Sequence, residues 1–187
     1  MLKPDLRKHF LNRRKLTDDS VIEKQSLDVR DRFAEEFGKL EFETVHCFLP
    51  ILKHKEINTW PLIDFFSEKT VVVSKSDFKT HEMHSFVLEK NTPLEENRWG
   101  IPEPVNARPI HEHKIDLVLI PLLTFDKLGY RVGYGKGFYD RFLQRCRPDV
   151  LKVGLSLEAP VEKISDTHEH DQKLDYCITP DKVWSFV

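Results

Sequence analysis

A nine-residue stretch, Ile115–Leu123, is the most apolar part of this chain and the strongest constraint on its fold. Only Asp116 and Pro121 interrupt it. It is far too short to span a bilayer as a helix, which takes about 20 apolar residues. A strand that is apolar on both sides must be covered on both faces, as in a parallel sheet flanked by helices. The stretch therefore predicts a buried central strand over Ile115–Ile120.

The segments around this strand alternate between strand-like and helical patterns. Helical patterns cover Asp5–Lys15 and Asp18–Leu40, with Thr17 and Asp18 as candidate caps of the second helix, and recur at Trp60–Ser67 and Gly137–Arg147. The other β-branched or aromatic runs are Thr44–Leu49, Thr70–Ser74, His84–Leu88, Leu151–Leu157 and Tyr176–Thr179. This alternation predicts an α/β domain with a largely parallel, buried sheet. Asn91–Pro109, rich in proline, is expected to be a long ordered surface loop.

Length and composition limit the classes of protein to consider. The 187 residues suggest a single domain, residues 1–187, and a formal charge of -2 argues against a nucleic-acid partner. No signal-peptide run follows the basic start, so no membrane partner is expected. Three scattered cysteines (Cys47, Cys146 and Cys177) form no CxxC pair, which favours a reducing, cytoplasmic setting. Nothing indicates a coiled coil or a swapped arm, so a monomer is the default expectation.

Glycines cluster in one short segment after the apolar strand. The chain has only seven, yet Gly129, Gly133, Gly135 and Gly137 fall within nine residues. Glycine lets backbone N–H groups turn toward an anion, and the segment leads into a helix that is expected to begin near Phe138. A helix N-terminus offers free N–H donors and the positive end of its dipole. The segment therefore predicts a phosphate-binding loop.

Side chains in this loop suit the same role. Arg131 and Lys136 could neutralise charge on a phosphoryl group, and Asp140 could hold magnesium. Three aromatic residues could stack on a flat heterocycle: Tyr134, Phe138 and Tyr139. The segment matches neither a Walker loop nor a Rossmann fingerprint. The alternative is a glycine-rich turn in which Asp140 caps the helix and the aromatic side chains belong to the core.

The segment from Pro121 to Arg141 resembles the signature of the 5-formyltetrahydrofolate cyclo-ligase family, roughly P-G-x-x-F-D-x-x-G-x-R-x-G-x-G-x-G-[YF]-Y-D. Leu122 replaces the glycine that usually follows the proline. Four more matches follow the family's order along almost the whole chain. They are Lys3-x-x-x-Arg7, Glu56 within Lys55–Thr59, the G-I-x-E-P segment Gly100–Pro104, and the C-terminal stretch His170-Asp171-x-x-Leu174-Asp175.

The resemblance implies a three-layer α/β/α fold and an enzyme that uses ATP and Mg²⁺ to cyclise 5-formyltetrahydrofolate to 5,10-methenyltetrahydrofolate. ADP and phosphate would be released after the N5-formyl oxygen is phosphorylated. The implied ATP site contains Lys3, Arg7, Arg131, Gly133, Tyr134, Gly135, Lys136, Gly137, Phe138 and Tyr139. Arg131 and Lys136 would be catalytic. The implied substrate site contains Glu56, Leu49, Ile51, Met83, Tyr134 and Phe138. Asp140 and Asp171 would organise the metal.

Other interpretations stay open at this point. Leu49, Ile51 and Met83 could simply be core residues, and Trp99 could stack on folate or pin the long loop. The spacings His111-x-His113, His168-x-His170 and His81-x-x-His84 fit metal ligation, the last on a helix, but surface histidines explain them better. Rival functions are a phosphosugar-handling α/β enzyme and a folate- or nucleotide-binding relative without turnover. The second would be expected to lack a loop cation or a metal carboxylate.

Overall fold

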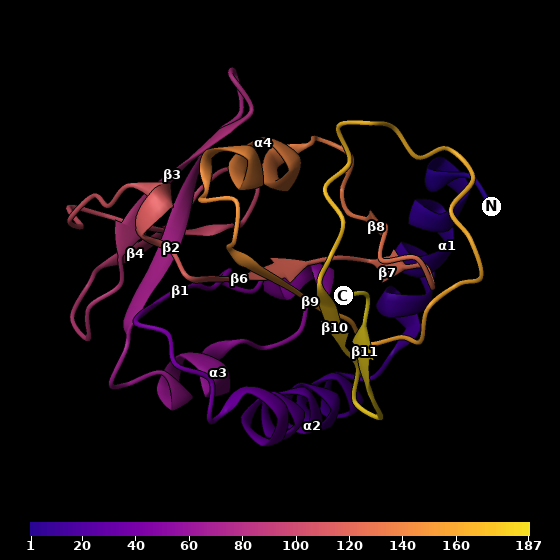
Figure 1. The fold of residues 1–187 in the computed structure, drawn as a ribbon, viewed down its shortest axis with the longest axis horizontal. Helices are drawn as coiled ribbons and strands as arrows, with labels where there is room; N and C mark the ends of the chain where they lie inside the picture. Colours follow the sequence, from indigo (N-terminus) through magenta and orange to yellow (C-terminus); the bar gives the residue numbers. More distant parts are fainter.

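A seven-stranded sheet forms the centre of the computed structural model, which describes all 187 residues (Figure 1). Its order is β11-β10-β9-β6-β1-β2-β3. The five strands from β10 to β2 run parallel, and the edge strands β3 and β11 are antiparallel to their neighbours. The strands are β1 (Thr44–His46), β2 (Thr70–Asp77), β3 (Glu82–Val87), β6 (Leu117–Pro121), β9 (Leu151–Leu155), β10 (Tyr176–Ile178) and β11 (Val183–Ser185).

Helices cover both faces of this sheet, which makes three layers (Figure 1). Helices α2 (Asp19–Phe37) and α3 (Trp60–Phe65) lie on one face, and α4 (Phe138–Arg145) lies on the other. Leu117 and Leu119 of β6 belong to the core cluster under α2 and α3, whereas Val118 and Ile120 belong to the cluster under α4. Both sides of β6 are therefore buried, which explains why its sequence is apolar throughout.

The N-terminal helix α1 (Lys3–Leu16) lies beyond one end of the sheet, beside a small two-stranded ribbon (Figure 1). The ribbon pairs β7 (Thr124–Phe125) with β8 (Arg131–Val132). Leu6 and Phe10 of α1 pack against Leu123 and Val132 in a separate small core. This packing places the first turn of α1 next to the glycine loop that follows β8.

The expected α/β class and the expected strands are confirmed, with some ends shifted by a few residues. Some details differ. Asp18 is the N-cap of α2, but its side chain makes no capping hydrogen bond. The long loop contains a hairpin, β4 (Leu94–Glu96) with β5 (Pro102–Pro104). His81 and His84 lie at the β2–β3 hairpin and not on a helix, with His81 at φ +60°. No helix is long and apolar enough to cross a membrane.

Candidate active site

A cavity of about 510 Å³ opens where β1, β2 and β6 end, a common ligand position in parallel sheets. The 3-10 turn η1 (Leu52–His54), α1, the long loop and the start of α4 complete its wall. All sixteen residues predicted for the site lie in its lining: Lys3, Arg7, Leu49, Ile51, Glu56, Met83, Arg131, Gly133, Tyr134, Gly135, Lys136, Gly137, Phe138, Tyr139, Asp140 and Asp171. The structure brings them together, and their individual roles remain predictions.

The glycine loop runs from β8 to α4 and forms one end of the cavity. Gly135 and Gly137 have φ of +87° and +68°, a region that favours glycine. The backbone N–H groups of residues 134–140 donate no hydrogen bond inside the protein. Gly137 is the N-cap of α4, so Asp140 does not cap this helix. A row of free donors at a helix N-terminus can bind an anion such as phosphate.

Basic side chains surround these donors. Arg7 donates from Nε to the carbonyl of Gly133 at 2.9 Å, and a Cβ on Gly135 would lie only 2.9 Å from the Arg7 guanidinium carbon. Lys136 is exposed at the cavity rim and its side chain makes no ion pair. Positive charge and free N–H groups therefore meet at the same end of the cavity.

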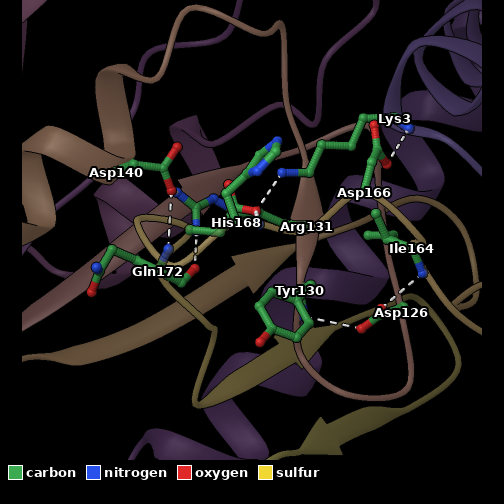
Figure 2. Close-up of polar contacts among 10 residues, drawn as sticks. Lys3, Asp126, Tyr130, Arg131, Asp140, Ile164, Asp166, His168 and Gln172 are labelled. Atoms are coloured by element: carbon green, nitrogen blue, oxygen red, sulfur yellow. Dashed lines mark hydrogen bonds and ion pairs between the residues drawn. The ribbon is translucent and has the colours of Figure 1, made fainter.

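Arg131 is held under the loop by specific contacts (Figure 2). Its side chain is only 7% exposed, and one terminal nitrogen contacts Oδ1 of Asp140 at 2.7 Å. The other terminal nitrogen donates to the carbonyl of Gln172, and the Gln172 amide donates back to Oδ1 of Asp140 at 3.1 Å. Arg131 therefore joins the glycine loop, α4 and the C-terminal loop, which is the segment 156–175 between β9 and β10. Its guanidinium is fixed before any ligand binds.

Asp171 belongs to a second ion pair, with Lys3 of α1. Its Oδ2 also accepts the His168 N–H at 2.7 Å. Burial alone would raise the pKa of Asp171, but these contacts with Lys3 and His168 outweigh it and lower that pKa. The Lys3 amide also donates to Oδ1 of Asp166 at 2.7 Å. The first turn of α1 is thus fastened to the C-terminal loop.

The two carboxylates suit Mg²⁺ that arrives with a phosphate ligand. Asp140 and Asp171 line the same cavity, and each keeps one oxygen, Oδ2 and Oδ1 respectively, without a hydrogen bond in the protein. No group of three or more His, Cys, Asp or Glu residues is placed to hold a metal ion. Mg²⁺ typically binds through one or two carboxylates, with phosphate oxygens and water as the other ligands. The donor set fits that pattern.

Glu56 lies in the cavity wall, where the charge of the buried Arg14 acts on it. It is 7% exposed, accepts a hydrogen bond from the Tyr134 hydroxyl at 2.6 Å and another from the Ile51 amide at 2.8 Å. Burial raises the pKa of Glu56, and these two hydrogen bonds only partly offset that effect. The Tyr134 ring packs on His54, with ring centroids 5.3 Å apart. Tyr134 therefore positions a buried acceptor while its ring packs on His54.

Apolar and aromatic side chains form the rest of the wall. Leu49, Ile51 and Met83 all line the cavity while being largely buried, so they serve the core and the pocket together. Trp99 is half exposed and stacks on Phe78 at 5.3 Å, so it both borders the cavity and pins the long loop to the β2–β3 hairpin. The cavity thus combines free donors and positive charge with an apolar lining that contains a carboxylate.

Several lining residues were absent from the predicted site, among them His46, Ser74 and Phe78. His46 is a lone histidine in an otherwise apolar strand, a signal that could have been noticed. Phe78 reaches the cavity only because the β2–β3 hairpin folds over it, which sequence spacing does not reveal. His111 and His113 stack on each other at 5.4 Å outside this cavity.

Comparisons with known proteins agree with this architecture. The model of the 5-formyltetrahydrofolate cyclo-ligase family matches residues 1–180. A protein of Schizosaccharomyces pombe named probable 5-formyltetrahydrofolate cyclo-ligase is 32% identical over 186 residues, with 88% of each chain covered. The Escherichia coli K12 5-formyltetrahydrofolate cyclo-ligase is 28% identical over 137 residues, covering 70% of this chain and 75% of the relative.

Solved structures show the same fold. The 5,10-methenyltetrahydrofolate synthetase of Aquifex aeolicus superposes with a TM-score of 0.74 at 28% identity, covering 100% of this chain and 93% of the other. The synthetase of Mycoplasma pneumoniae also gives 0.74, at 22% identity, covering 96% and 99%. Fold and site define a three-layer α/β enzyme with a loop suited to binding phosphate. The chain belongs to the 5-formyltetrahydrofolate cyclo-ligase family.

Proposed function

We propose that this enzyme uses ATP to close the ring of 5-formyltetrahydrofolate, giving 5,10-methenyltetrahydrofolate, ADP and phosphate. The observation that carries the proposal is one cavity with two kinds of lining. The glycine loop, Arg7 and Lys136 offer free donors and positive charge, and buried Glu56 offers a carboxylate beside apolar side chains. A nucleotide phosphate and a flat heterocycle with N–H donors match these two kinds of lining.

The reaction needs the formyl carbon to be activated. In the proposed sequence, the N5-formyl oxygen attacks the γ-phosphorus of ATP, and ADP leaves. N10 then attacks the formyl carbon and loses its proton, and phosphate departs as the ring closes. An amide-like carbonyl is a poor electrophile, so phosphorylation of its oxygen supplies a leaving group. Such transfer depends mainly on alignment and charge neutralisation.

The residues of this chain supply alignment and charge. The N–H groups of residues 134–140, with Lys3, Arg7 and Lys136, would hold the phosphates. Arg131, fixed by Asp140 and Gln172, would meet charge that develops during transfer. Asp140 and Asp171 would hold Mg²⁺, which would offset the negative charge of the phosphates. Glu56 would accept hydrogen bonds from the reduced pterin.

A single assay tests the proposal. Purified protein is mixed with 5-formyltetrahydrofolate, ATP and Mg²⁺, and the near-ultraviolet absorbance of the methenyl product is followed. We expect ATP-dependent growth of this band. Arg131→Ala should lower turnover on the order of a hundredfold, as for other donors to transition-state charge, whereas Lys39→Ala, an exposed lysine outside the cavity, should not. A folded wild-type protein with a flat trace would refute the proposed reaction.

The cysteines bear on the cellular compartment in which the protein works. All three cysteines are buried and free, which suits a reducing compartment such as the cytoplasm. A monomer that acts on small molecules, without nucleic acid, remains the working expectation. Size-exclusion chromatography with light scattering would test the oligomeric state.

A further inference from the structure

A buried histidine and a serine form a hydrogen-bonded pair in the cavity wall. His46, at the end of β1, is 0% exposed, and its Nε2 lies 2.8 Å from Oγ of Ser74 on the neighbouring strand β2. The imidazole packs against the rings of Phe142, at 4.7 Å, and Tyr139, at 5.8 Å. Ser74 is only half-buried and lines the cavity. The pair therefore presents a hydroxyl whose partner is rigidly fixed.

The geometry matches that of a nucleophile and its base, but the electrostatics do not. Burial lowers the pKa of His46 to about 3. An imidazole whose pKa is lowered by burial is a weak base, which argues against general-base activation of the serine. What remains is a neutral histidine that orients a neighbouring hydroxyl.

The ring nitrogens of His46 differ in their surroundings, because only Nε2 has a hydrogen-bond partner. A hydroxyl has one donor and two acceptor sites. Whichever ring nitrogen carries the proton, the hydrogen bond to Nε2 leaves the Ser74 oxygen at least one lone pair for a ligand.

We propose that Ser74, oriented by His46, is a second acceptor in the folate site and receives an N–H of the reduced pterin. This inference rests on the proposed function. The location of Ser74 supports this role. Ser76 lies on the same face of β2 as Ser74. It is paired with Met83 of β3, which lines the same cavity. Ser74 contacts the ligand directly, and His46 acts as a positioning residue that holds the Ser74 oxygen in place.

Steady-state kinetics on three variants test this role. Ser74→Ala should raise KM for 5-formyltetrahydrofolate about three- to tenfold, the size of one neutral hydrogen bond, with KM for ATP unchanged. Ser74→Thr keeps the hydroxyl and should stay within about twofold of wild type on the same reasoning. His46→Phe keeps an aromatic ring but removes Nε2, so it should raise the same KM. Ser67→Ala, an exposed serine beyond α3 and outside the cavity, is the matched control.

The double variant His46→Phe/Ser74→Ala separates positioning from a merely structural role. If His46 acts through Ser74, the double variant should have the same KM as Ser74→Ala alone. An active wild type with an unchanged KM in Ser74→Ala, or an additive double variant, would overturn the assignment and leave the proposed function intact. A folded wild-type protein that binds no 5-formyltetrahydrofolate by calorimetry would instead overturn both.

Discussion

Glu56 is a carboxylate that the fold keeps almost entirely out of water. In the unfolded chain the pKa of a glutamate is about 4.3. In the folded protein the pKa of Glu56 is higher, because burial disfavours the charged form. The contribution of such a group to stability is fully present below the unfolded pKa and is lost as the pH rises through the folded pKa. This loss is expected to be a cost that the enzyme bears in order to keep a charged acceptor for its substrate.

Glu56→Gln should therefore separate stability from binding. As the pH rises from about 4 toward neutrality, Tm of the variant should rise relative to wild type, because only the wild type ionises there. Affinity for 5-formyltetrahydrofolate should fall, since the buried charge is lost. Differential scanning calorimetry across pH and calorimetric titration measure the two effects. A Tm difference that does not depend on pH would show that Glu56 titrates in the same way in the folded and unfolded chain.

Gly135 is the glycine whose conformation matters most to the loop. It combines φ of +87° with direct contact to Arg7. Gly135→Ala should raise KM for ATP at least tenfold, because the added methyl group strains the backbone and displaces the guanidinium. Gly133→Ala is a suitable comparison, since no atom lies within 4 Å of a Cβ built there. Equal increases in KM for ATP in the two variants would mean that the contact between Gly135 and Arg7 does not explain the effect of Gly135→Ala.

At the scale of elements, the loop between β7 and β8 depends on one buried carboxylate. Asp126 is 0% exposed and accepts the amides of Leu128 and Tyr130 through Oδ1 and that of Ile164 through Oδ2. Figure 2 shows the contacts with Tyr130 and Ile164. It therefore joins the start of the glycine segment to the C-terminal loop. No ligand is needed to explain its burial.

Asp126→Ala should lower the free energy of unfolding by about 3 kcal/mol, because one buried and two partly buried amides lose their acceptor. Urea denaturation measures this change. Asp149→Ala, which removes an aspartate with a 75% exposed side chain, should stay within about 0.5 kcal/mol of wild type. A loss for Asp126→Ala as small as that of the control would mean that water replaces the carboxylate.

Elements with a strong local pattern were predictable from the sequence, and those defined by distant contacts were not. Strand β6 was found because burial on both faces requires apolar residues. The glycine loop was found because its backbone conformation requires glycines. The ribbon β7–β8 and strand β11 are two or three residues long and exist through pairing, so they carry no periodicity. Likewise, family resemblance located Lys3 and Asp171, but not their ion pair.

At the scale of the whole molecule, the anion-binding end of the cavity joins segments from both ends of the chain. Binding of ATP with Mg²⁺ should therefore slow amide hydrogen exchange in residues 134–140 and also in the first turn of α1 and in His168–Gln172. Amides in the middle of α2, such as that of Val29, serve as an internal control. Protection confined to the glycine loop would show that the ion pair between Lys3 and Asp171 does not transmit the ordering.

The contact between Lys3 and Asp171 also has a consequence for biosynthesis. The two residues are 168 positions apart, and a ribosome adds about 5–20 residues per second. A newly made Lys3 must wait on the order of ten seconds for its partner to be translated. Until then the first turn of α1 has no carboxylate to hold it, and the nascent protein cannot bind nucleotide in the way proposed for the finished enzyme.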